Sequence, residues 1–202
     1  MHSKLNNDNS EYDEDSDKKL ILMLADGCET ALNKLMQRYK HKLFFFIFKY
    51  VQNEDVAYDI LQETFIRVYT KANTYKPQFA VSTWIYQISM NLCRDWGRKQ
   101  KVKQFISLDT FFSPDSTNSL LEKIEDPLSD TENLVFHRYQ LEFIEKEIQK
   151  LPHKLKTALI LFAIEGHSQE KCAEILNVTP KTVEMRVYRA RKILLEKIPE
   201  IF

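Results

Sequence analysis

The sequence has little glycine, cysteine or proline, with 3 Gly, 3 Cys and 6 Pro among 202 residues. So little glycine, together with few alternating runs of β-branched residues, argues against a sheet protein and favours helices. Cys28, Cys93 and Cys172 are odd in number and far apart, which is typical neither of a disulfide framework nor of a zinc site. We therefore expect three reduced thiols, no metal and no other cofactor.

Long hydrophobic runs and catalytic motifs are also lacking. The most apolar stretch, Leu43 to Phe48, is far too short to cross a bilayer, and Met1 to Lys19 is polar and acidic, unlike a signal peptide. The five histidines are scattered, and no Gly-rich phosphate loop or pair of nucleophile and base is evident. We expect a cytoplasmic protein that is not an enzyme, takes no small-molecule substrate and does not insert directly into membranes.

An excess of charge of one sign is absent as well, because Lys+Arg and Asp+Glu both number 29 and the formal net charge is +0. The balance conceals a segregation of charge along the chain. Residues 91–104 carry five cations against the single acid Asp95, and residues 181–192 are similarly basic, whereas acids gather in residues 11–17 and 109–132. Local charge decides where a polyanion binds, so both basic stretches are candidate nucleic-acid sites.

The apolar spacing predicts an all-α fold with two small helical domains joined by an acidic flexible linker. Expected helices include 54–72, 82–100, 133–150 and 154–165, the last ending at Gly166. Asp17 is expected to cap the first helix. The expected divisions are a disordered acidic tail over 1–17, a helical domain over 18–104, a linker over 105–132 and a second helical domain over 133–202.

Residues 168–191 predict a helix-turn-helix in the second domain. Small Ala173 suits a close helix crossing, Asn177 suits a turn with positive φ, and Thr179 followed by Pro180 is a strong helix start. Val183, Val187 and Ala190 are spaced to face inward. The residues expected to face DNA are Lys181, Thr182, Glu184, Met185, Arg186 and Arg189. The alternative is an ordinary helical hairpin with a solvated basic face.

Two surfaces of the first domain are further candidates. Asp59, Gln62, Glu63 and Arg67 form one polar stripe of a helix, which indicates either a docking face or ordinary solvation. Aromatic side chains beside the basic run suit the capture of unstacked bases, since stacking on an aromatic ring contributes about 1 to 3 kcal/mol per base. These aromatics are Tyr75, Phe79, Trp84, Tyr86 and Trp96. Trp84 has the spacing of a core residue, so the loop 73–81 is the better candidate for holding a base.

Three motifs in this order resemble a known family. They are DILQETFIRVY at 59–69, STWIYQISMNLCRDWGRKQK at 82–101, and LPHKLKTALILFAIEGHSQEKCAEILNVTPKTVEMRVYRARKIL at 151–194. Together they resemble bacterial RNA polymerase sigma factors of the sigma-70 family, extracytoplasmic-function (ECF) class. The resemblance covers residues 20–103 and 136–198 and implies a protein that directs promoter-specific initiation, with core RNA polymerase, promoter DNA and an anti-sigma factor as partners.

The resemblance also assigns roles to residues. It implies that core polymerase is bound by Asp59, Gln62, Glu63 and Arg67. It also implies that the six outward residues of the helix-turn-helix contact the minus 35 element. The residues implied for the minus 10 element are Tyr75, Phe79, Trp84, Asn91, Arg94, Arg98, Lys99 and Lys101.

The chain departs from the family pattern at several positions. Val81 stands where the family commonly has Phe, so either Phe79 supplies that aromatic group or the loop is built differently. Lys181, Glu184 and Met185 also replace family residues in the recognition segment, and Glu184 could accept from a cytosine amino group. A stand-alone helix-turn-helix regulator is the alternative function, and an adaptor that binds an acidic protein is a third.

Overall fold

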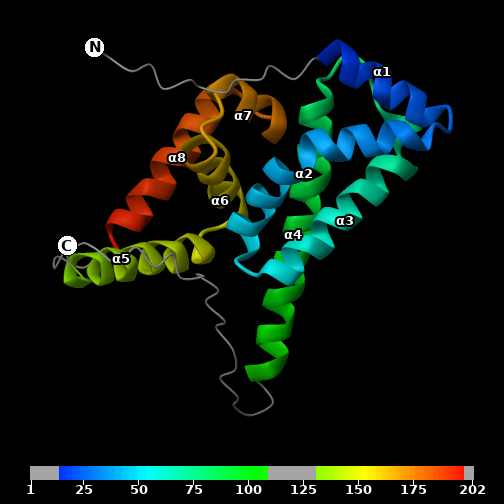
Figure 1. Cartoon of the computed structure of the whole chain (residues 1–202). Helices are drawn as coiled ribbons and strands as arrows, with labels where there is room; N and C mark the ends of the chain where they lie inside the picture. The colour runs from blue at the N-terminus through cyan, green and yellow to red at the C-terminus, as the bar shows by residue number, and fades with distance from the viewer. Residues whose placement is uncertain (1–13, 109–130, 198–202) are drawn as a thin grey trace.

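The computed structural model describes residues 14–108 and 131–197, and the regular structure of these residues is helical with no strand. This confirms the all-α prediction. Figure 1 shows an amino-terminal group of helices beside a carboxyl-terminal group. The first group contains α1 (Glu14–Ala25), α2 (Glu29–Val51), α3 (Glu54–Thr70), the short 3-10 helix η1 (Ala72–Thr74) and α4 (Val81–Leu108). The second contains α5 (Thr131–Lys150), α6 (His153–Leu159), the π-helix η2 (Ile160–Ile164), α7 (Gln169–Leu176) and α8 (Pro180–Leu195).

The first module, α1 to α4, is built around the apolar face of α2. Leu35, Tyr39 and Phe46 are fully buried, and the Phe46 ring meets the buried Tyr86 ring of α4 edge-on at 5.6 Å. Burying one large apolar side chain contributes roughly 1.5 to 3 kcal/mol. This core fixes the position of α4, which extends beyond the module as a long single helix (Figure 1).

The expected start of the ordered chain is wrong by several residues. Helix α1 begins at Glu14, inside the segment predicted to be a disordered tail, and Asp17 lies within this helix, not at its cap. Asp17 is fully buried because its carboxylate contacts the guanidinium of Arg38 and the hydroxyl of Tyr39 on α2. A buried charge needs such partners. The remaining part of the expected tail, residues 1–13, lies outside the described residues.

The linker predicted over 105–132 is helical at both ends. Helix α4 continues to Leu108, eight residues past the expected end at Gln100, and α5 begins at Thr131. Residues 101–108 contain no glycine or proline, and the first breaker is Pro114, so nothing in the sequence stops the helix earlier. The central acidic stretch, 109–130, lies outside the described residues. The domain limits 18–104 and 133–202 stay predictions.

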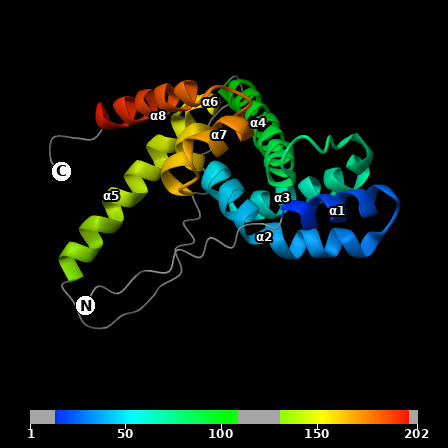
Figure 2. The same ribbon diagram turned by 90° about the horizontal axis from the view of Figure 1, so that it is seen from above.

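The second module, α5 to α8, has a smaller core. Ile160, Leu161, Ile175 and Val183 are fully buried. The helix expected over 154–165 changes from α to π winding at Ile160 and ends before Gly166, whose φ of +71° fits the predicted stop. Figure 2 shows α5 projecting away from the other helices. No helix in the described parts of the chain is long and apolar enough to span a membrane.

Candidate nucleic-acid and polymerase interfaces

The helix-turn-helix forms as the local sequence predicts. Asn177 adopts the left-handed conformation, with φ 50° and ψ 54°, in the turn between α7 and α8. The hydroxyl of Thr179 accepts from the backbone N–H of Thr182 at 3.3 Å, and Pro180 occupies the first helical position. Ser168 caps α7 by accepting from the Lys171 N–H at 3.1 Å. These contacts define the turn and the starts of both helices, and α8 presents its other face to solvent.

The outer face of α8 contains most of the predicted DNA-facing residues. Val183, Val187 and Ala190 are buried, as expected. Lys181, Glu184, Met185 and Arg189 are exposed, whereas Thr182 and Arg186 are half-buried. The Lys181 ammonium contacts the Glu184 carboxylate at 3.0 Å, so the charges of these two of the three departures in this segment neutralise each other in this arrangement.

Sequence reasoning missed one prominent residue of this face. The side chain of Tyr188 is 62% exposed and lies beside a pocket of about 420 Å³ lined also by Phe162, Gln169 and Met185. The spacing contained the signal, because Tyr188 is one turn after Met185 and two turns after Lys181.

The stripe of α3 predicted to dock on polymerase divides into two parts. Asp59 and Gln62 are exposed, whereas Glu63 and Arg67 are half-buried and form an ion pair at 2.8 Å. Three apolar or aromatic residues that sequence reasoning left out share the exposed face, namely Tyr58, Ile66 and Tyr69, which are 54%, 49% and 42% exposed. The face is therefore mixed apolar and polar, as expected of a surface that binds protein.

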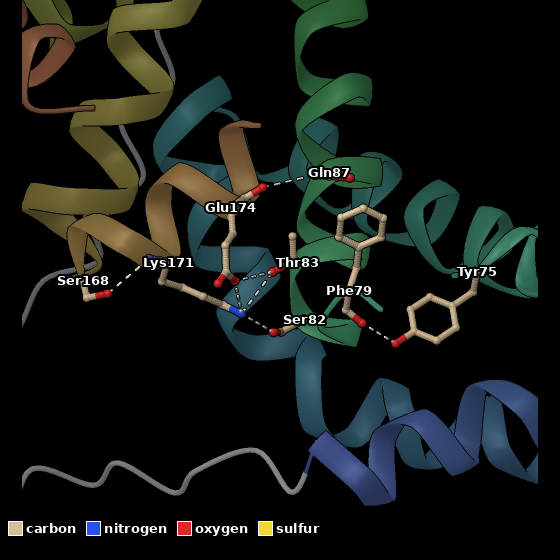
Figure 3. Close-up of polar contacts among 8 residues, drawn as sticks. All are labelled: Tyr75, Phe79, Ser82, Thr83, Gln87, Ser168, Lys171 and Glu174. Carbon is tan, nitrogen blue, oxygen red and sulfur yellow. Dashed lines mark hydrogen bonds and ion pairs between the residues drawn. The ribbon is translucent and has the colours of Figure 1, made fainter. Parts of the chain in front are cut away.

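The loop before α4 holds one aromatic side chain outward. Phe79 is 52% exposed. Tyr75 is buried, its ring lies 5.4 Å from that of Trp84, and its hydroxyl donates to the backbone carbonyl of Phe79 at 2.6 Å (Figure 3). Val81 is fully buried, so Phe79 is the aromatic side chain that this loop exposes. Tyr86, by contrast, is a core residue.

The basic part of α4 is partly turned toward the second module. Asn91 and Arg94 are half-buried, Arg98 and Lys99 are exposed, and the side chain of Lys101 lies outside the described part. Burial and the positive charge of this part of α4 lower the pKa of His153 on α6. Its pKa is lowered to about 4, first by burial and then by the positive charges of Arg94, Lys156, Arg98 and Arg186. Cations predicted for two different DNA elements thus gather near one side chain.

The two modules meet along a surface that we call the seam, formed by α2 and α4 on one side and α5, α6, η2 and α7 on the other. Its α2 part includes several polar contacts. The Lys49 ammonium contacts the Glu145 carboxylate at 2.8 Å, and the Tyr50 hydroxyl lies 2.9 Å from Nδ1 of His153. Lys156 is buried, donates to the backbone carbonyl of Tyr50 at 3.3 Å and lies 4.3 Å from the centre of its ring.

The α4 part of the seam also has polar contacts, which Figure 3 shows in detail. Nζ of Lys171 on α7 donates to Oγ of Ser82 at 2.8 Å and to Oγ1 of Thr83 at 3.1 Å. Thr83 in turn donates to the carboxylate of Glu174 at 3.4 Å, and the side-chain amide of Gln87 donates to the backbone carbonyl of Glu174 at 3.3 Å. Ser82 and Thr83 are each only 2% exposed under this cover.

Comparison with known proteins identifies both modules. The family model described as Sigma-70 region 2 matches residues 35–102, and the model described as Sigma-70, region 4 matches residues 142–194. The chain is 30% identical over 192 residues to the ECF RNA polymerase sigma-E factor of Haemophilus influenzae, covering 91% of this chain and 95% of that protein. It is 29% identical over 189 residues to the Escherichia coli K12 protein of the same name, covering 91% and 94%.

Two solved structures share the fold. CnrH in complex with the cytosolic domain of CnrY gives a TM-score of 0.61 at 22% identity, covering 90% of this chain and 96% of that chain. The sigma factor RpoE in complex with the anti-sigma factor NepR, from Bartonella quintana, gives a TM-score of 0.58 at 21% identity, covering 81% and 94%. By sequence and by fold, the chain belongs to the extracytoplasmic-function class of sigma-70-family RNA polymerase sigma factors, the proteins that direct promoter-specific initiation of transcription.

Proposed function

We propose that the first module docks on core RNA polymerase through α3 and captures the melted minus 10 strand, while α8 of the second module binds duplex minus 35 DNA. The observation that supports this division best is the pairing of an outward helix-turn-helix with a separate exposed stripe on α3. One surface suits DNA and the other suits protein. The chain has no catalytic step of its own in this account, and it acts in the cytoplasm with the polymerase.

The docking step uses Asp59 and Gln62 as its polar contacts, with Tyr58, Ile66 and Tyr69 beside them. Exposed aromatic and aliphatic side chains within a polar rim are the residues that contribute most to protein interfaces. Glu63 and Arg67 stabilise the helix through their ion pair and border the same face. The partner surface is expected to offer apolar side chains together with cations for Asp59.

Strand capture uses Phe79 as the stacking platform. Its ring is exposed, and the bond from Tyr75 to its backbone carbonyl holds the loop in place. Tyr75 and Trp84 are then positioning residues, because each is buried or half-buried against the other. Asn91, Arg94, Arg98, Lys99 and Lys101 would contact the phosphates that follow.

Recognition of the minus 35 element uses the exposed residues of α8. Glu184 can accept from a cytosine amino group, and Met185 can contact a thymine methyl group. Arg189 would contact phosphates. Lys181 and Glu184 would first exchange their ion pair for contacts with DNA, and Arg186 and Thr182 reach DNA only if their present contacts change.

This division of labour requires the modules to separate. The two promoter elements are about 25 base steps apart, or ~85 Å at 3.4 Å per step. Helix α8 is 16 residues long, or about 24 Å. It begins directly after α7, whose Glu174 is 3.3 Å from Gln87 of the first module. The packed arrangement therefore cannot place both modules on their DNA elements at once.

In vitro transcription with core polymerase and a promoter library tests the proposal. We expect initiation at a defined subset of promoters that depends on the added chain. Arg186→Ala combined with Arg189→Ala should weaken use of the minus 35 element while leaving core binding intact. Initiation without sequence preference, together with equal binding to duplex DNA in the absence of polymerase, would support the stand-alone regulator instead.

We also propose an anti-sigma factor as a regulatory partner. The support comes from the two solved relatives, whose structures contain CnrY and the anti-sigma factor NepR respectively. Co-purification of the tagged chain from its native cells, followed by mass spectrometry, tests this. A bound protein that blocks transcription when added back to purified components is the expected result.

A further inference from the structure

The donors of α4 form one continuous stripe. Thr83, Gln87, Asn91, Arg94 and Arg98 follow each other at spacings of three or four residues, which places them within an arc of about 80° on an α-helix. The last three are residues predicted to contact the minus 10 strand. The first two were not predicted, yet they extend the same stripe toward the loop that exposes Phe79.

Helix α7 covers the beginning of this stripe. Glu174 offers two kinds of acceptor there, an anionic carboxylate oxygen to Thr83 and a neutral backbone carbonyl to Gln87. A nucleic-acid strand presents the same two kinds of acceptor, namely phosphate oxygens and the carbonyl and ring-nitrogen acceptors of its bases. The donors that α7 occupies are therefore chemically suited to a DNA strand.

Lys171 holds this cover in place. Its ammonium donates to both Ser82 and Thr83 and lies 3.6 Å from the Glu174 carboxylate, so one side chain links the two helices. The Lys171 side chain is 27% exposed and that of Glu174 is 59% exposed. Polar contacts this close to solvent exchange readily with water, so weakening them should make it easier for the cover to leave.

We propose that α7 is an intramolecular plug that occupies the strand-binding donors Thr83 and Gln87, and that these two residues contact the melted promoter strand once the plug leaves. The inference rests on the proposed function, because it assumes that α4 meets single-stranded DNA. It adds two strand-contacting residues and a specific competitor for them. The same helix that begins the helix-turn-helix would then prevent strand capture until the modules separate.

Strand binding by the free, full-length chain tests the plug. The probe is a fluorescent single strand that carries the non-template sequence of a promoter from which the chain initiates in vitro. Lys171→Met keeps the length of the side chain and removes its charge. We expect it to bind the probe between about twofold and tenfold more tightly than the wild type, as the loss of one or two net hydrogen bonds in the plug implies. Lys154→Met, an exposed lysine of α6, is the matched control and should leave binding unchanged.

The assignment of the donors is tested in the same assay. Adding Gln87→Ala or Thr83→Val to Lys171→Met should remove the gain, because the released strand site has then lost a donor. Glu174→Gln weakens the acceptor to Thr83 without changing its shape, so it should repeat the gain even if Lys171→Met perturbs folding. No gain in either single variant overturns the plug, and a gain that survives Gln87→Ala and Thr83→Val overturns the assignment of these residues.

Transcription separates this inference from the function on which it rests. Each variant is also assayed with core polymerase on the same promoter. If the wild type and Lys171→Met both initiate but bind the single strand equally, the plug is wrong and the proposed function stands. If neither initiates at any promoter, the proposed function itself is wrong.

Discussion

The interior of each module and the seam between the modules are stabilised by different forces. Inside the first module, Leu35, Phe46, Ile47 and Ile85 are fully buried and apolar. Across the seam, hydrogen bonds and ion pairs, as between Lys49 and Glu145, accompany ring contacts such as that between Tyr86 and His167. Exposing apolar side chains to water costs more free energy than replacing polar contacts by water. We therefore expect the seam to open more readily than either module unfolds.

The largest effect should follow from damaging a core. Phe46→Ala removes a fully buried ring that meets Tyr86, so we expect a loss of about 3 to 5 kcal/mol in the free energy of unfolding. Chemical denaturation followed by circular dichroism measures it. The matched control is Phe45→Ala, the next residue of α2, which is 60% exposed and should cost less than about 1 kcal/mol. Equal losses in both variants would contradict the assignment of the core.

A smaller effect should follow from acidifying the seam. The pKa of His153 is about 4 in the folded chain, below its usual value of 6.5, because burial and nearby cations disfavour its charged form. The stability that this neutral side chain contributes is complete above pH 6.5 and is lost as the pH falls toward 4. With His153 partly solvated, we expect a loss of about 1 to 2 kcal/mol.

The readout is the difference between the wild type and His153→Gln, measured from pH 7 to pH 4. Taking this difference removes the contributions of other titratable groups. One of these is Glu165, whose pKa is raised by burial. The wild type should lose more stability than His153→Gln across this range. Parallel curves for the two proteins would show that His153 does not titrate at the seam.

A local change within the second module should have an effect of about 1 kcal/mol. Thr179→Ala removes the hydroxyl that caps α8, and loss of such a cap costs about 0.5 to 2 kcal/mol. Thr179→Ser keeps the hydroxyl and serves as the control. Thermal unfolding of both variants provides the measurement, and a Thr179→Ser variant as unstable as Thr179→Ala would mean that the methyl group, not the cap, matters.

The smallest effect on stability should come from the docking face. Asp59→Asn with Gln62→Ala changes exposed side chains of α3, so we expect the free energy of unfolding to stay within about 0.5 kcal/mol. Affinity for core polymerase, measured by fluorescence titration, should nevertheless fall severalfold. Gln37→Ala on the exposed face of α2 is the control and should leave affinity unchanged. Unaltered affinity in the double variant would remove these residues from the interface.

Local chemistry was enough to predict the helix-turn-helix. Asn177 and Thr179 act through contacts within three or four residues, so their types alone indicate the turn and the cap. The same holds for Gly166, which ends the preceding helix with positive φ. Inward residues such as Val183 and Val187 follow from helical spacing.

Contacts between distant residues could not be predicted in this way. The burial of Asp17 depends on Arg38 and Tyr39, 21 and 22 positions away, and the seam joins Lys171 to Ser82 across 89 positions. Exposed apolar residues were missed for another reason. Tyr188 and Ile66 were assigned no role from the sequence, although helical spacing places both on outward faces.

The distance between the modules tests the central claim most directly. Labels at Asn33→Cys on α2 and Glu196→Cys at the end of α8, in a Cys28→Ser background, allow pulsed electron spin measurements on the free chain and on its complex with core polymerase and promoter DNA. We predict a single distance in the free chain and an increase of tens of ångströms in the complex, because the two modules move onto promoter elements that are ~85 Å apart. An unchanged distance in a complex that initiates transcription would contradict the separation of the modules at the seam.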